Sequence, residues 1–116
     1  MEFICYSKCS TCKKAKEYLD KNKIEYEERD IKTNNPTRAE LDIWVGKYCM
    51  PINKLFNTSG LLYKSMNLKD KLATMDDNEK LELLSSDGML VKRPILVNKD
   101  KILIGFKEKE WDEYFK

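Results

Sequence analysis

Cys9 and Cys12 are the residues of this sequence whose type and spacing best suit chemistry. They lie in the stretch FICYSKCSTCKKA, in which an apolar run is followed by a short polar break and then by lysines. Four roles fit such a pair: a structural disulfide, half of a zinc site, a redox-active pair, or two ordinary buried thiols. The remainder of the sequence narrows this choice.

The compartment and the ligand count argue against the first two roles. The start, MEFICYSKCS, has an acidic second residue and too few apolar positions for a secretory signal or a membrane span, so we expect a cytoplasmic protein. A reducing cytosol disfavours persistent disulfides. A closed zinc site needs four nitrogen or sulfur ligands, whereas the chain has no histidine, and Cys5 and Cys49 are single cysteines. We therefore expect no bound metal.

The composition predicts one globular domain over residues 1–116. Apolar residues make up 41% of the chain and charged residues 36%, which suits a folded protein rather than a disordered one. The 22 basic residues are nearly matched by 20 acidic ones, giving a net charge of +2. Direct nucleic-acid binding by bulk charge is therefore not expected. A monomer is the default assumption.

The N-terminal third has the pattern strand, helix, strand. Residues 1–7 form an apolar run, and Ala15, Tyr18 and Leu19 then recur on one helical face. Residues 24–31, IEYEERDI, alternate as in a strand. A strand, helix and strand in this order usually form a parallel βαβ unit.

Short helices and a hairpin follow. Thr37 to Glu40 has the form of a capping box, and a second acidic helix start lies at Asp76, so we expect a helical insertion over about residues 37–86. The runs PILV and KILIGF flank a hairpin loop, and a terminal helix places its aromatic residues in the core. This order predicts an α/β, thioredoxin-like fold with a central four-stranded mixed sheet flanked by helices.

The predicted helix gives Cys9 and Cys12 different properties. If the helix begins near Ser10, Cys9 lies at its N-terminus, where free backbone N–H groups favour an anion. Lys8 and the lysines of the helix add positive potential, and such a setting can lower a thiol pKa from about 8.5 to roughly 3.5–7.5. Cys12, one turn later, can then act as the resolving thiol. Two small buried thiols remain the alternative.

The other cysteines and one proline complete the candidates. We expect Cys5 to belong to the core and Cys49 to take no part in the chemistry. Pro94 suits the first position of a strand, and the Arg93–Pro94 bond is a candidate for the cis form, with a trans turn proline as the alternative.

The sequence resembles the arsenate reductase (ArsC) and Spx/MgsR family. The resemblance rests on CSTC after the first strand, NTSG at residues 57–60, DGMLVKRPILV at residues 87–97 and GFKEKEW near the end, and it spans essentially the whole length. It implies a thioredoxin fold with an inserted helical region. It also implies a catalytic cysteine at Cys9 and an anion-binding arginine at Arg93, before a cis proline at Pro94.

The anion site implied by the resemblance contains Arg93, Pro94 and the start of the first helix with Lys8, Ser10 and Thr11. Glutaredoxin-coupled arsenate reductases carry two further oxyanion-binding arginines, at positions that correspond here to Asn57 and Gly105. They also usually lack the second cysteine of the pair. A single arginine is expected to hold a tetrahedral dianion less tightly than three charged partners would.

The resemblance implies two functions of different classes. The first is a thiol-disulfide oxidoreductase without a bound cofactor, which takes electrons from thioredoxin, glutaredoxin or glutathione and reduces arsenate or a protein or glutathione disulfide. The alternative is an Spx-like redox-sensing transcriptional regulator that binds the RNA polymerase alpha subunit, although such regulators carry a C-terminal extension and a glycine at the position of Pro51.

Overall fold

The structure, a computed structural model, describes residues 1–116. The chain divides into two compact units, the first formed by Met1–Asp30 with Arg93–Lys116 and the second by Ile31–Lys92. No helix combines the length and apolar character needed to cross a membrane. Cys9, Cys12 and Arg93 all belong to the first unit.

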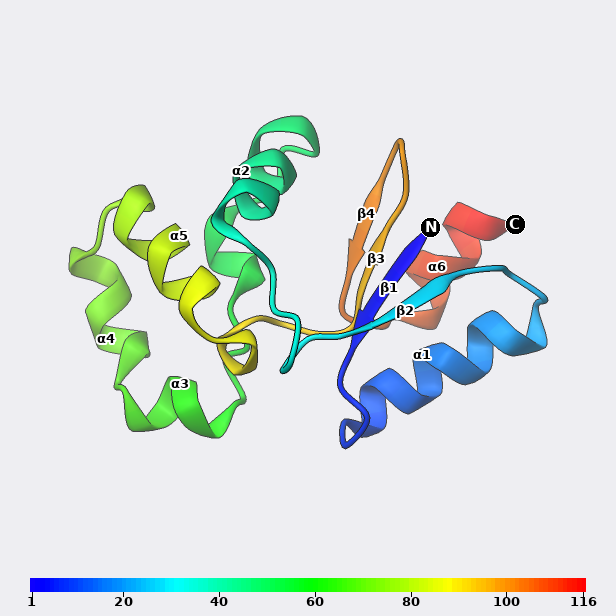
Figure 1. The fold of residues 1–116 in the computed structure, drawn as a ribbon, viewed down its shortest axis with the longest axis horizontal. Helices are drawn as coiled ribbons and strands as arrows, with labels where there is room; N and C mark the ends of the chain where they lie inside the picture. Colours follow the sequence, from blue (N-terminus) through cyan, green and yellow to red (C-terminus); the bar gives the residue numbers. More distant parts are fainter. The chain divides into compact units, whose positions relative to one another are not determined.

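A four-stranded mixed sheet forms the centre of the first unit (Figure 1). Its strands lie in the order β2-β1-β3-β4, and their bounds are Glu27–Asp30 for β2, Glu2–Cys5 for β1, Ile95–Val97 for β3 and Ile102–Ile104 for β4. β1 and β2 are parallel, whereas β3 pairs antiparallel with both β1 and β4. The predicted βαβ unit and C-terminal hairpin are therefore confirmed.

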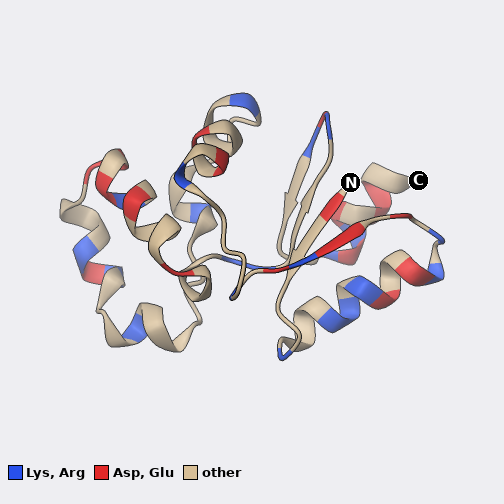
Figure 2. Cartoon of the chain, viewed as in Figure 1, with Lys and Arg blue, Asp and Glu red and all other residues tan.

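Helices α1 (Ser10–Lys21) and α6 (Glu108–Phe115) accompany this sheet. Lysines and acidic residues are intermixed along α1 (Figure 2). Lys13, Lys14 and Lys16 of this helix are exposed.

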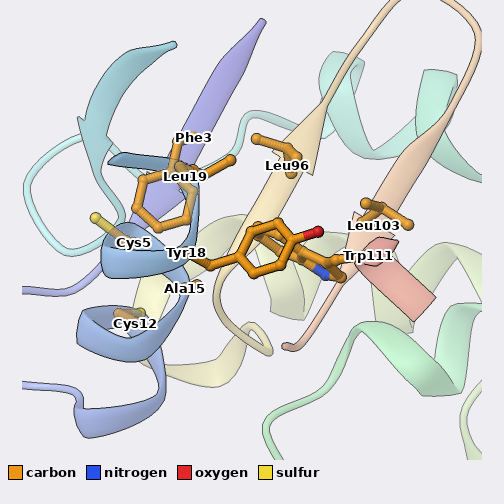
Figure 3. Packing of buried hydrophobic residues seen from close by; sticks show 9 residues of the cluster. All are labelled: Phe3, Cys5, Cys12, Ala15, Tyr18, Leu19, Leu96, Leu103 and Trp111. Carbon is orange, nitrogen blue, oxygen red and sulfur yellow. The ribbon is translucent and has the colours of Figure 1, made fainter. Parts of the chain in front are cut away.

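One face of the sheet and both helices enclose the core of the first unit (Figure 3). Phe3, Leu96 and Leu103 are register partners across three strands and therefore point to the same face. Against them pack the predicted apolar positions of α1 and Trp111 of α6. Tyr18 meets Trp111 edge to face, with ring centroids 5.8 Å apart.

The end of β4 is tied to both the start of β3 and helix α6. Gly105 has φ of 76°, a conformation that suits glycine, and its N–H donates to the Pro94 carbonyl at 2.8 Å. Its carbonyl accepts a hydrogen bond from Trp111 Nε1 at 3.2 Å. An arginine side chain at this position would strain the backbone.

Short helical segments make up the second unit, as predicted. Their bounds are Arg38–Lys47 (α2), Ile52–Leu55 (η1), Leu61–Ser65 (α3), Leu68–Lys71 (α4), Leu72–Thr74 (η2), Asp77–Ser86 (α5) and Gly88–Leu90 (η3). Both predicted helix starts are capping boxes, with Thr37 paired with Glu40 and Asp76 paired with Glu79. A Cβ at Gly88 would lie 1.8 Å from the Ile31 carbonyl oxygen, so this close approach requires glycine.

The first two strands are shorter than the sequence pattern predicts. β1 ends at Cys5 because the backbone N–H of Tyr6 turns to the Cys12 sulfur and its carbonyl accepts from Cys9 N–H. β2 begins only at Glu27, because Ile24 N–H bonds the Leu19 carbonyl and so belongs to the turn that closes α1.

Candidate functional site

Cys9 occupies the N-cap position of α1. Its backbone is extended, with φ of −97° and ψ of 122°, and its N–H donates to the Tyr6 carbonyl at 3.0 Å. Its own carbonyl accepts the first helical hydrogen bond, from Lys13 N–H at 3.1 Å. The side chain is partly buried and lies at the positive end of the helix, where a thiolate is favoured.

Cys12 lies one turn further along and is buried, with 3% of its surface exposed. Its sulfur accepts a hydrogen bond from Tyr6 N–H at 3.3 Å. Burial raises the pKa of the Cys12 thiol to about 12, and negative charge at Cys9 acts in the same direction, against the effect of the Tyr6 N–H. Cys12 is therefore a protonated thiol at neutral pH.

Cys9 titrates in the opposite direction. Partial burial acts to raise the pKa of its thiol, but the backbone N–H and thiol of Cys12 and the Arg93 guanidinium outweigh it, so the pKa is lowered. The pair thus combines an accessible, activated thiol with a protonated one behind it. This is the division of roles that nucleophile and resolving thiol require.

Arg93 is close to this pair although it lies near the other end of the chain. The peptide bond between Arg93 and Pro94 is cis, directly before β3. The guanidinium carbon lies 5.1 Å from the centre of the Tyr6 ring. The Nε and Nη1 atoms are buried and have no hydrogen-bond partner within the chain. Two buried N–H donors without partners are suited to an anionic ligand.

Three of the other expected site residues are neighbours of Cys9 along the chain. Lys8 is exposed in the turn between β1 and α1, and Ser10 and Thr11 are exposed in the first turn of α1. Pro94 is buried. The cation that lowers the Cys9 pKa is Arg93 rather than Lys8. No group of three or more histidine, cysteine or acidic side chains is arranged to hold a metal ion.

Tyr6 is the site residue that the sequence analysis missed. Its carbonyl fixes Cys9, its N–H fixes the Cys12 sulfur, and its ring covers Arg93. A signal was present in the sequence, because Tyr6 is an aromatic residue between a strand and a basic loop. Its main-chain hydrogen bonds, however, depend on where β1 ends, and the apolar pattern of the sequence predicts a longer strand.

Cys12 also lines a cavity of about 470 Å³. Cys5 lines it and is buried in the core, as predicted. The Cys5 thiol faces Glu28 Oε1 at 3.6 Å, and burial together with the charge of Glu28 raises the pKa of Cys5 to about 12. Cys49, in contrast, is exposed in the second unit, with φ of 53°.

Comparison with known proteins agrees with this geometry. A model described as the ArsC family matches residues 5–114. Uncharacterized protein YusI of Bacillus subtilis (strain 168) is 43% identical, with 97% of this chain and 96% of that protein aligned. Regulatory protein MgsR of the same organism is 34% identical over 95% of this chain and 86% of its own length.

A solved structure extends the comparison to three dimensions. The crystal structure of "a possible arsenate reductase" from Streptococcus mutans UA159 is 42% identical, covers 96% of both chains and superposes with a TM-score of 0.86. The family match covers nearly all of the sequence, including both cysteines and Arg93. This chain therefore belongs to the ArsC family.

Proposed function

We propose that this protein is a thiol-disulfide oxidoreductase in which Cys9 is the nucleophile and Cys12 the resolving thiol. The observation that carries the proposal is the contrast between the two thiols. The pKa of Cys9 is lowered at a partly accessible helix N-terminus, whereas burial raises the pKa of Cys12 directly behind it. A structural role for both thiols would not require opposite ionisation.

The reaction proceeds through a mixed disulfide. The Cys9 thiolate attacks one sulfur of a substrate disulfide, which forms a bond to Cys9 and releases one substrate thiolate. Cys12 loses its proton and attacks the Cys9 sulfur, and the second substrate thiolate leaves. The two released thiolates take up protons. The substrate has gained two electrons, and the protein holds a Cys9–Cys12 disulfide that an external dithiol such as thioredoxin or glutaredoxin, or glutathione, reduces again.

Arg93 gives this site a preference for substrates that carry an anionic group. Its unpartnered Nε and Nη1 donors can bind two oxygens, and the exposed start of α1 with Lys8, Ser10 and Thr11 adds further positive potential. A glutathione carboxylate and arsenate both fit this description. The likeness to the Streptococcus mutans protein supports including arsenate among the substrates tested.

A coupled turnover assay tests the proposal. Hydroxyethyl disulfide, glutathione disulfide and arsenate are supplied in separate arms, each with NADPH-linked thioredoxin or glutaredoxin as the reductant. We expect NADPH consumption above that of the reductant system alone, and this excess should be lost in Cys9→Ser and kept in Cys49→Ser, because Cys49 is exposed in the other unit. No excess consumption in any arm, or equal rates for wild type and Cys9→Ser, would overturn the proposal.

A redox-dependent regulator is the second candidate, favoured by the similarity to Regulatory protein MgsR. In this case oxidation of the same cysteine pair changes the affinity of the protein for the RNA polymerase alpha subunit, and no substrate is turned over. The discriminating experiment is a binding measurement with purified alpha subunit and the protein in its reduced and oxidised forms. Binding that changes with oxidation, together with no turnover in the coupled assay, would favour the regulator.

A further inference from the structure

The cavity that Cys12 lines is also lined by a carboxylate that the proposed reaction can use. It lies beside the end of β1, the start of α1 and β2, and Cys5, Cys12, Lys16, Glu28 and Asp30 are among the residues that line it. Glu28 is fixed there from two sides. Its carboxylate pairs with Lys16 Nζ at 3.0 Å, and it faces the Cys5 thiol at 3.6 Å.

The reaction needs a proton acceptor at this place. Cys12 can attack the mixed disulfide only as a thiolate, yet its sulfur is buried and accepts a hydrogen bond from the Tyr6 N–H. Burial favours the protonated form of the Cys12 thiol, so its proton must pass to a base before the sulfur can attack. Bulk water reaches the Cys12 sulfur poorly, because only 3% of the residue is exposed.

We propose that Glu28 accepts the Cys12 proton, through water in the cavity, as Cys12 attacks the mixed disulfide on Cys9. A cavity of about 470 Å³ that is lined in part by charged side chains has room for several waters with hydrogen-bond partners. The proposal rests on the oxidoreductase function given above. Glu28 acts through water, so it assists proton transfer without contacting the reacting sulfurs.

The atoms balance in this step. The Cys12 S–H proton passes to water and from that water to the Glu28 carboxylate. The Cys12 sulfur forms a bond to the Cys9 sulfur, and the bond between Cys9 and the substrate sulfur breaks. The substrate leaves as a thiolate and takes up a proton from solvent, and Glu28 returns its proton to solvent. The protein dithiol is oxidised by two electrons, and the substrate disulfide is reduced by two.

The charges around Glu28 are compatible with this role. Lys13 and Lys16 line the cavity from α1, Asp30 lines it from the same strand as Glu28, and Cys5 lines it from β1. Lys16 pairs directly with the Glu28 carboxylate. The Cys5 thiol, with its pKa of about 12, contributes no charge at neutral pH.

Release of thionitrobenzoate from Ellman's reagent separates the two steps. One equivalent of reagent is mixed in a stopped-flow instrument with protein carrying Cys49→Ser, which removes the exposed thiol. The first equivalent of thionitrobenzoate reports the attack by Cys9, and the second reports the attack by Cys12. In the parent protein we expect a second-phase rate that is nearly constant between pH 6 and pH 9, because proton transfer to Glu28 does not require hydroxide.

The Glu28→Gln substitution should slow the second phase at pH 7 by about 100-fold, the lower end of the range for proton-transfer catalysis. Its rate should then rise about tenfold per pH unit, since hydroxide must replace the lost base. Glu28→Asp should restore a phase that is independent of pH. The matched control is Glu27→Gln, a substitution of the neighbouring exposed glutamate, which should leave both phases unchanged. An unchanged first phase shows that each variant is folded at the site.

Three results would overturn the proposal. Equal second phases in the parent and Glu28→Gln, or an effect produced instead by Asp30→Asn, would remove Glu28 from the step. A parent second phase that rises tenfold per pH unit would do the same, even if Glu28→Gln did not fold. If the parent protein released only one equivalent of thionitrobenzoate, Cys12 would not resolve the mixed disulfide on Cys9. That result would contradict the proposed function itself.

Discussion

At the scale of single residues, the main interaction of the site joins the Arg93 guanidinium and the Cys9 thiol. The guanidinium lowers the pKa of the Cys9 thiol, while the Tyr6 ring and main chain fix the positions of both partners. A fixed cation stabilises the thiolate, so removing it must raise the pKa and reduce the ionised fraction at neutral pH.

Alkylation of Cys9 by iodoacetamide measures this effect. In a background with Cys12→Ser and Cys49→Ser, the rate should increase with an inflection below the ordinary thiol value of about 8.5, because only the thiolate reacts. Arg93→Met should move the inflection upward and slow alkylation at pH 7. The control, Lys8→Met, removes an exposed lysine from the neighbouring turn and should shift it far less. An inflection at or above about 8.5 without any substitution would contradict the account.

Anion binding depends on the shape of the Arg93 side chain as well as on its charge. Arg93→Lys keeps the positive charge, so the Cys9 inflection should change little. It removes the planar fork, so affinity for sulfate or arsenate should fall by about 1–3 kcal/mol, the range for hydrogen bonds to charged groups. Calorimetry at fixed salt measures this change.

The neighbouring substitution Lys92→Gln is the control for anion binding, since Lys92 is an exposed cation next to Arg93 in the sequence. It should leave the affinity unchanged. Equal affinities for wild type and Arg93→Lys, or no binding to either at millimolar anion, would remove the anion site and shift weight to the regulator.

At the scale of elements, capping determines where the helices begin. Thr37 Oγ1 accepts from Glu40 N–H at 3.1 Å, and Glu40 Oε1 accepts from Thr37 N–H at 3.0 Å. Thr37→Ala should lower the free energy of unfolding by about 0.5–2 kcal/mol, whereas Thr37→Ser keeps the hydroxyl and should lower it much less. Urea denaturation distinguishes the two variants. An alanine variant as stable as wild type would show that α2 begins without help from this box.

The elements were predictable from sequence to the extent that their signals are local. Both capping boxes, the helix face of Ala15, Tyr18 and Leu19, and the hairpin after Pro94 follow from nearby residues, and all are present. The resemblance supplied the placement of Arg93, which no local pattern gives.

Side-chain arrangements across strands were not predictable in the same way. β2 consists of Glu27 to Asp30, an entirely charged stretch, because pairing with β1 fixes its register and the apolar Ile24 belongs to the preceding turn. The contacts of Glu28 with Lys16 and Cys5 follow from that register. The cavity and the role of Tyr6 were missed for the same reason, since both depend on where strands end.

At the scale of the whole molecule, the sequence predicts one domain over residues 1–116. The structure divides this chain into two compact units. The two tryptophans report on them separately, because Trp111 is buried in the first unit and Trp44 in the second. Trp44→Phe and Trp111→Phe each leave a single fluorescent reporter. If the chain is one cooperative domain, the fluorescence and circular dichroism midpoints in urea should coincide within each variant. Separate midpoints would mean that the units unfold independently.

The central claim is that Cys9 and Cys12 form a reversible redox pair, and disulfide mapping tests it most directly. The protein is oxidised with mild peroxide, its remaining thiols are alkylated, and the peptides are identified by mass spectrometry before and after treatment with reduced thioredoxin. The account predicts a dominant Cys9–Cys12 bridge that thioredoxin removes, with buried Cys5 and exposed Cys49 alkylated or unreacted. A dominant bridge that involves Cys5 or Cys49, or no bridge between Cys9 and Cys12, would contradict it.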